Sequence, residues 1–179
     1  MTVLAAMVVG IAVGLLTGGH VREAGRSRVR SVWLLVAGVG LQLLAGRLSG
    51  VGVVPFLVAY ALLGAFAVRN VTRTGMGVIL LGLALNAAPI VLDGGMPVES
   101  HAIVSAGMAT TAEVADLSFG GKRHLAHPGD HLRGLDDTIP DWFTHEVLSF
   151  GDLVIAVGVA AVFAGLLHPS YTPAVSHRS

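Results

Sequence analysis

Residues 76–98 read MGVILLGLALNAAPIVLDGGMPV, and the fold prediction depends on this stretch. Its first part, up to Leu92, is apolar around the whole circumference of a helix, apart from Asn86. A membrane-spanning helix needs about 20 mostly apolar residues, whereas a helix on the surface of a soluble domain carries a polar stripe. The stretch therefore predicts a transmembrane helix that ends at Asp93-Gly94-Gly95.

Similar apolar stretches occur at four other places, residues 2–17, 32–46, 51–68 and 150–167. Hydrophobic residues make up 54% of the chain and charged residues 12%, about half the charge of an average soluble domain. We therefore predict an all-α fold, a polytopic transmembrane bundle of about five spans in a single membrane domain, residues 1–179. No basic residue precedes the first stretch, so we expect an uncleaved helix rather than a signal peptide.

Basic residues indicate the orientation of such a bundle, because Lys and Arg concentrate in short cytoplasmic loops. Four arginines lie between the first two stretches, and Arg69 and Arg73 follow the third. This places the N-terminus outside and the C-terminus inside. The segment of about residues 94–148 becomes a long outer loop, and its residues 99–117 are apolar enough for one or two short helices.

Charge and cysteine content exclude several classes of function. Eleven basic and eleven acidic residues give a formal net charge of zero, so nothing indicates nucleic-acid binding. Because the chain has no cysteine, disulfides, thiolate catalysis and Cys-ligated metals are excluded. There is no phosphate-binding loop and no HExxH or GxSxG motif, and we expect no cofactor.

Several short motifs occur together in the second half of the chain. They are Asn86…Pro89, Asp93-Gly94-Gly95-Met96-Pro97-Val98, Lys122-Arg123-His124, Leu135-x-Asp137-x-Ile139-Pro140 and Ser149-Phe150-Gly151-Asp152. In combination, over about residues 30–167, they resemble a family of small bacterial integral membrane proteins described only as a domain of unknown function. The resemblance implies a multi-pass protein of the bacterial cytoplasmic membrane and implies no activity.

Asp93 and Asp152 are the most informative polar positions of the predicted helices. A carboxylate is unfavourable within a span and at a helix C-terminus, so Asp93 suggests a polar pocket with Asn86, seven residues earlier, or a helix stop with a basic partner. Ser149-x-x-Asp152 has the spacing of a capping box at the start of a helix. If both aspartates lie at the outer level, they can bind a cation or share a proton. Gln42 and Tyr60 we assign to packing between helices.

The predicted outer loop contains two further candidate sites. His124, His127, Asp130 and His131 fall within eight residues and are ligand types that suit Zn²⁺ or another transition metal, although a solvated loop is the interpretation that we favour. Asp137, in the D-x-IP motif, is a ligand-binding candidate with Asn86, Asp93, Ser149 and Asp152.

Glycines at intervals of four residues suggest close helix packing. Gly10, Gly14 and Gly18 form two overlapping GxxxG steps, which serve either packing within the chain or a homo-oligomer. The expected partners are the lipid bilayer, a second copy of the chain or another membrane protein.

Two classes of function follow from these observations. We favour a non-enzymatic protein, a small carrier or a subunit of a membrane complex with an outward-facing polar site, because no set of nucleophile and base is recognisable. The alternative is an intramembrane enzyme, or a proton- or cation-coupled transporter, that uses Asp93 and Asp152.

Overall fold

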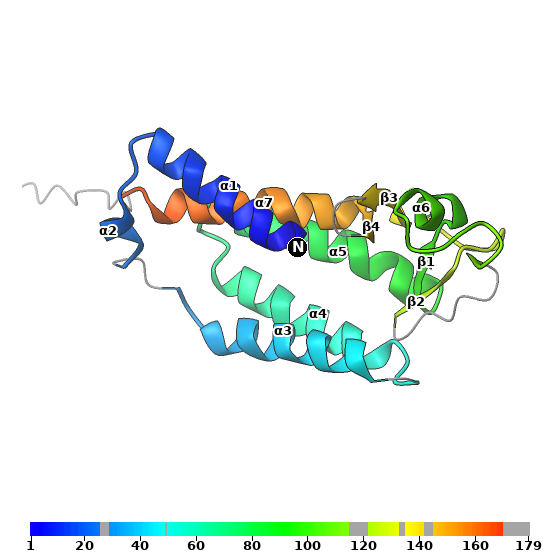
Figure 1. Cartoon of the computed structure of the whole chain (residues 1–179). Helices are drawn as coiled ribbons and strands as arrows, with labels where there is room; N and C mark the ends of the chain where they lie inside the picture. Colours follow the sequence, from blue (N-terminus) through cyan, green and yellow to red (C-terminus); the bar gives the residue numbers. More distant parts are fainter. Residues whose placement is uncertain (26–28, 49, 115–121, 133–134, 142–144, 170–179) are drawn as a thin grey trace, which may run out of the picture.

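Five long helices lie alongside one another, and a small β-sheet covers one end of them (Figure 1). The computed structural model describes residues 1–25, 29–48, 50–114, 122–132, 135–141 and 145–169. The long helices are α1 (Thr2–Leu16), α3 (Val32–Arg47), α4 (Val54–Arg69), α5 (Met76–Leu92) and α7 (Phe150–Leu166). Two short helices are α2 (Val21–Ala24) and α6 (Ser100–Ser105). All five apolar stretches of the sequence are therefore helical, with ends within three residues of those predicted.

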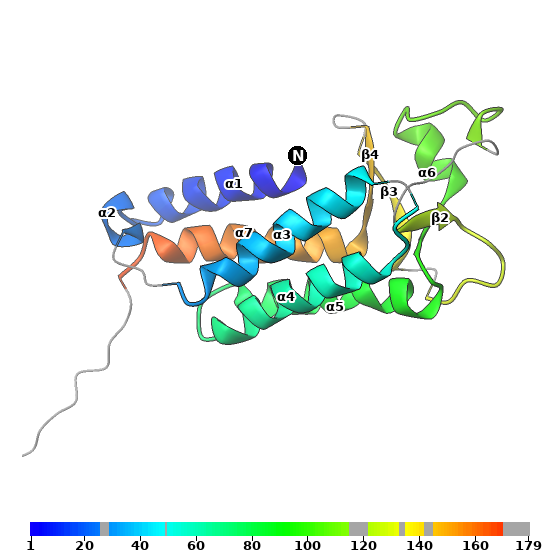
Figure 2. The same ribbon diagram turned by 90° about the horizontal axis from the view of Figure 1, so that it is seen from below.

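The helices pack in a chain of neighbours, α1 on α7, α7 on α5, α5 on α4 and α4 on α3 (Figure 2). Glycine makes the α5–α7 contact close. A Cβ atom on Gly82 would lie 2.8 Å from the Gly151 carbonyl oxygen, and one on Gly158 would lie 2.8 Å from the Ile79 backbone nitrogen. The two backbones thus touch at two levels, which brings the polar groups of α5 and α7 within reach of each other.

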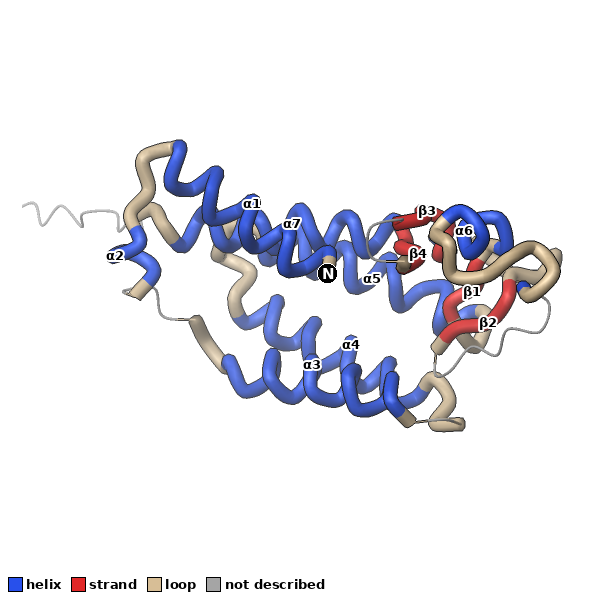
Figure 3. The backbone as a smooth tube through the Cα atoms, in the orientation of Figure 1, coloured by secondary structure: helices blue, strands red, loops and turns tan. Residues whose placement is uncertain are grey.

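The sheet has four strands in the order β2-β1-β3-β4 (Figure 3). Its strands are β1 (Met96–Val98), β2 (Arg123–Leu125), β3 (Asp137–Asp141) and β4 (Glu146–Ser149). β1 is parallel to β2 and β3, whereas β3 and β4 are antiparallel. The register places Met96 beside Arg123 and Val98 beside Asp137. Because β1 follows α5 and β4 runs directly into α7, the sheet joins onto the ends of both central helices.

A separate hydrophobic core lies beneath the sheet. It consists of buried side chains of α6, of the residues that follow α6 and of the strands, among them Ile103 and Val147. At the opposite end of the helices, the buried Asn70 side chain bonds the backbone N–H and carbonyl of Arg30 at 2.9 Å and so ties α4 to the segment before α3.

The all-α prediction is wrong, because four strands form where a partly helical outer loop was expected. α6 confirms one of the short helices predicted in residues 99–117. The strands have only three to five residues. They are too short to show the alternation of apolar and polar residues by which strands are recognised, and β1 pairs with β2 across a long separation in sequence.

The prediction of transmembrane helices, and with it the multi-pass membrane location and the inside–outside orientation, is also corrected. The longest helices, α5 and α7, have 17 residues each. Among the described residues, none of the helices combines the length and the apolarity that crossing a bilayer requires. The prediction gave more weight to the apolarity of these runs than to their length, which is below the usual ~20 residues of a span.

Gly10 and Gly14 serve packing within the chain. A Cβ atom on Gly10 would overlap the backbone of Ala160 in α7, and one on Gly14 would lie 3.1 Å from the Ala164 Cα atom. Gly18, with φ of +88°, has no atom within 4 Å of where its Cβ would lie. Contact between α1 and α7 therefore accounts for the first two of these three glycines.

Candidate functional site

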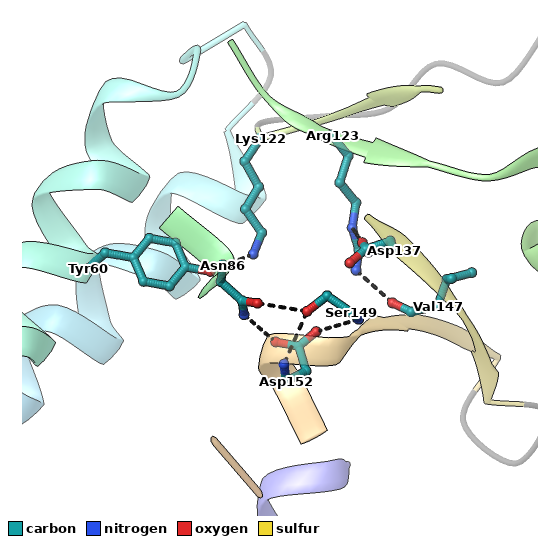
Figure 4. Close-up of polar contacts among 8 residues, drawn as sticks. All are labelled: Tyr60, Asn86, Lys122, Arg123, Asp137, Val147, Ser149 and Asp152. Atoms are coloured by element: carbon teal, nitrogen blue, oxygen red, sulfur yellow. Dashed lines mark hydrogen bonds and ion pairs between the residues drawn. The ribbon is translucent and has the colours of Figure 1, made fainter. Parts of the chain in front are cut away.

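A hydrogen-bonded polar cluster joins α5 to the start of α7, next to the sheet (Figure 4). The Asn86 side-chain amide donates to Asp152 Oδ1 at 2.7 Å, and the Ser149 hydroxyl donates to Asn86 Oδ1 at 2.7 Å. Asn86 and Ser149 are buried. Because buried polar groups are costly unless they are paired, this cluster fixes the mutual position of the two helices.

The predicted capping box at the start of α7 is confirmed. The Asp152 backbone N–H donates to Ser149 Oγ at 3.1 Å, and the Ser149 backbone N–H donates to Asp152 Oδ2 at 3.2 Å. Asp152 is therefore held by its own helix terminus and by Asn86 of α5. A carboxylate at this position also interacts favourably with the helix dipole.

Two cations lie beside the cluster, Lys122 immediately before β2 and Arg123 at its first position. Lys122 Nζ donates to the Tyr60 hydroxyl oxygen at 3.0 Å and lies 5.4 Å from the centre of the Tyr60 ring (Figure 4). Arg123 Nε is 2.7 Å from Asp137 Oδ2, and its Nη2 donates to the Val147 carbonyl oxygen at 2.9 Å. The Arg123–Asp137 contact is an ion pair.

Asp137 is buried, and burial disfavours the charged form of its carboxyl group. Burial raises the pKa of Asp137 to about 6, and Asp152 acts in the same direction, while Arg123 and Lys122 lower the pKa by less. The carboxyl side chain is 2% exposed. Beside the cluster there is therefore a carboxyl group that changes its charge near pH 6.

We expect Asp137 to make the stability of the protein depend on pH. Its pKa is higher in the folded chain, about 6, than its ordinary value of 3.8, so folding favours the protonated form. The stabilisation that results is present below about pH 4 and is lost as the pH rises through 6, a change of about 3 kcal/mol. Urea denaturation of the wild type and Asp137→Asn at pH 4 to 7 measures it. As the pH rises from 4 to 7, the free energy of unfolding of the wild type should fall relative to that of Asp137→Asn. Parallel pH profiles for the two proteins would show that Asp137 does not make stability depend on pH.

A cleft of about 520 Å³ extends from the polar cluster between the long helices. The start of α1, with Met1, Thr2 and Val3, also lines it at the polar end. Around this end lie the side chains of Gln42, Tyr60, Asn86, Lys122, Arg123, Glu146 and Asp152. The volume falls in the range of small-molecule sites, which are mostly apolar with a few polar groups that orient the ligand.

The lining of the cleft changes from polar to apolar with distance from the sheet. One helical turn beyond the polar end, the wall consists of Val39, Leu63, Leu83 and Ile155. One turn further, it consists of Leu35, Phe66, Ile79 and Val159. The apolar part thus extends over two turns, about 10 Å of helix. The cleft is therefore polar at the end next to the sheet and apolar over the two helical turns beyond it.

Asp93 lies apart from this cluster. The His131 backbone N–H donates to Asp93 Oδ1 at 2.9 Å, and the His131 ring Nδ1 is 2.7 Å from the same oxygen. Burial acts to raise the pKa of Asp93, but the two hydrogen bonds from His131 outweigh it and hold the pKa below its usual value. Asp93 and Asp152 therefore have different partners, and the carboxylate pair considered from the sequence is not assembled.

The histidine-rich segment divides between two carboxylates. His124 Nε2 is 3.4 Å from Asp130 Oδ1, and the His127 backbone N–H donates to Asp130 Oδ2 at 2.6 Å, while His131 turns to Asp93. The His124 and His127 rings stack at 5.9 Å. Over the described residues, no three His, Cys, Asp or Glu side chains are placed to hold a metal ion, so this geometry lends the metal prediction no support.

Of the five candidates for ligand binding, the structure brings together Asn86, Ser149 and Asp152. Asp137 lies beside them, because it pairs with Ser149 in the register of β3 and β4. Sequence reasoning missed Lys122 and Arg123 as site residues and assigned Tyr60 to packing. Two adjacent cations in an otherwise weakly charged chain were the signal that could have found them.

The sequence motifs meet at this site. The Gly95-Met96-Pro97-Val98 segment contains β1, and Arg123 begins β2 directly after Lys122. The D-x-IP motif lies in β3, and Ser149 to Asp152 join β4 to α7. These features define the class to which the protein belongs, a mixed α/β protein with an amphipathic cleft between its helices.

The chain belongs to a family of unknown function, DUF5317, whose family model matches residues 26–164. The resemblance to a family of unknown function predicted from the motifs is thereby confirmed. The match covers the sheet and every polar side chain of the cluster, whereas α1 precedes it. No curated protein and no solved structure matches the chain.

Proposed function

We propose that the protein is a non-enzymatic binding protein or carrier that holds a small, elongated, largely apolar molecule in the interhelical cleft. The observation that carries this proposal is the division of the cleft into a polar end and two apolar turns. The tightly paired Asn86, Ser149 and Asp152 support a rigid binding site, since their hydrogen-bonding groups are committed to one another.

The alternative function, catalysis or proton coupling by Asp93 and Asp152, has no such support. The two carboxyl groups are bonded to different segments, Asp93 to His131 and Asp152 to α5. A proton-sharing pair needs its carboxyl groups in contact. The arrangement of these two carboxyl groups therefore favours binding over catalysis.

Nile red, an uncharged dye that fluoresces in apolar surroundings, tests the proposal. We expect one saturable Nile red site per chain in the wild type. Val39→Trp should abolish this site, because the larger side chain fills the first apolar turn of the cleft. Val36→Trp is the matched control, because Val36 lies on the same helix but outside the cleft lining and is 66% exposed. Equal binding by the two variants would overturn the proposal.

A further inference from the structure

Lys122 is the cation at the polar end of the cleft that has no carboxylate within ion-pair distance, within the part of the chain that the structure describes. Its contact is the neutral Tyr60 hydroxyl oxygen. The other charges at this end have partners. Arg123 pairs with Asp137, and the N-terminal amine lies 3.8 Å from Glu146.

The carboxylates near Lys122 are already engaged. Asp152 accepts hydrogen bonds from Asn86 and from the Ser149 backbone, and Asp137 is in contact with Arg123. A lysine ammonium has three donors, of which one is used by Tyr60. The Tyr60 hydroxyl oxygen accepts from Lys122, so its own proton is available as a further donor at the same place.

These donors lie at the polar end of the cleft, next to its apolar turns. From the level of Tyr60 and Asn86, the lining turns to Leu63 and Leu83 and then to Phe66 and Ile79. A ligand that satisfies both ends therefore carries an acceptor-rich anionic group next to a flexible or narrow hydrocarbon part.

We propose that the ligand is a single-chain amphiphile with an anionic end, a long-chain carboxylate or alkyl phosphate, whose head group binds Lys122 and Tyr60 and whose chain lies along the apolar turns of the cleft. This inference rests on the proposed binding function and assigns it a ligand class. A hydrogen bond to a charged group adds enough to binding for a preference of roughly tenfold or more over an uncharged head group.

Displacement of Nile red by four compounds tests this assignment. Dodecanoate and dodecyl phosphate should displace the dye at concentrations at least about tenfold lower than dodecanol does. Acetate, which has the head group without the chain, should not displace it. Comparison of the two anions distinguishes a carboxylate ligand from a phosphate ligand.

Variants at Lys122 assign the preference to this side chain. Lys122→Gln should retain Nile red binding and lose the preference for the anions, whereas Lys122→Arg should keep it. If the wild type binds Nile red in the cleft and dodecanol displaces it as well as dodecanoate does, the anionic ligand class is refuted and the binding function stands. If Val39→Trp leaves Nile red binding intact, the binding function itself fails. The comparison of compounds on the wild type decides the first question even if Lys122→Gln does not fold.

Discussion

Replacing Gly82 by alanine is expected to lower the free energy of unfolding by at least about 2 kcal/mol. An added Cβ would lie 2.6 Å from Ile155 Cγ1 and 2.8 Å from both the Ile155 backbone nitrogen and the Gly151 carbonyl oxygen. Overpacking typically costs about 1–3 kcal/mol, and here two of the three clashing atoms are backbone and yield only if the helices separate. Urea denaturation followed by circular dichroism measures the change.

Gly77→Ala is the control for this prediction, because Gly77 lies on the same helix and a Cβ there would have no neighbouring atom within 4 Å. Alanine is favoured over glycine in a helix by up to about 1 kcal/mol, so this variant should be as stable as the wild type or more stable. Equal effects of the two substitutions would contradict the close α5–α7 contact.

Asn86→Ala is expected to destabilise the protein by about 3 kcal/mol. The substitution removes the donor to Asp152 and the acceptor of the Ser149 hydroxyl. The first of these hydrogen bonds is part-buried and the second is buried. Each buried polar group left without a partner costs about 1–3 kcal/mol, more when it is charged. Denaturation at neutral pH measures this loss.

Gln42→Ala provides the comparison within the same cleft. Gln42 also lines the polar end, but the structure gives its side chain no hydrogen bond to the other described residues. Its replacement should change the free energy of unfolding by less than about 0.5 kcal/mol. A loss for Asn86→Ala no larger than that for Gln42→Ala would contradict the stabilising role of the cluster between α5 and α7.

The sequence allowed the helices and part of the site to be predicted, because both depend on local patterns. The capping box of Ser149 and Asp152 is a three-residue spacing, and it was identified without knowledge of its surroundings. Asn86 stood out because it is a polar side chain in an apolar run. The contact between Asn86 and Asp152, however, depends on the glycines that bring α5 and α7 together, and no local pattern specifies which helices are neighbours.

The errors have a similar physical origin. The transmembrane prediction rested on the uniform apolarity of the helices. Apolarity does not specify helix length, however, and the helices that the structure describes are too short to meet the requirement for a span. Many of these side chains are exposed, among them Val8 at 67% and Val36 at 66%. The sheet was not predicted, because Met96–Val98 and Arg123–Leu125 are too short to show the alternation of apolar and polar residues that is typical of strands. As a result, Lys122 and Arg123 were not expected beside Asp137 and Tyr60.

The most direct test of an amphiphile in the cleft is photo-crosslinking with a dodecanoate analogue that carries a diazirine at the far end of its chain. We predict labelling in the apolar turn that contains Leu35, Phe66, Ile79 and Val159, and its loss in Val39→Trp. Labelling confined to exposed apolar positions such as Val8 or Val36, unaffected by Val39→Trp, would contradict the binding of the chain in the cleft.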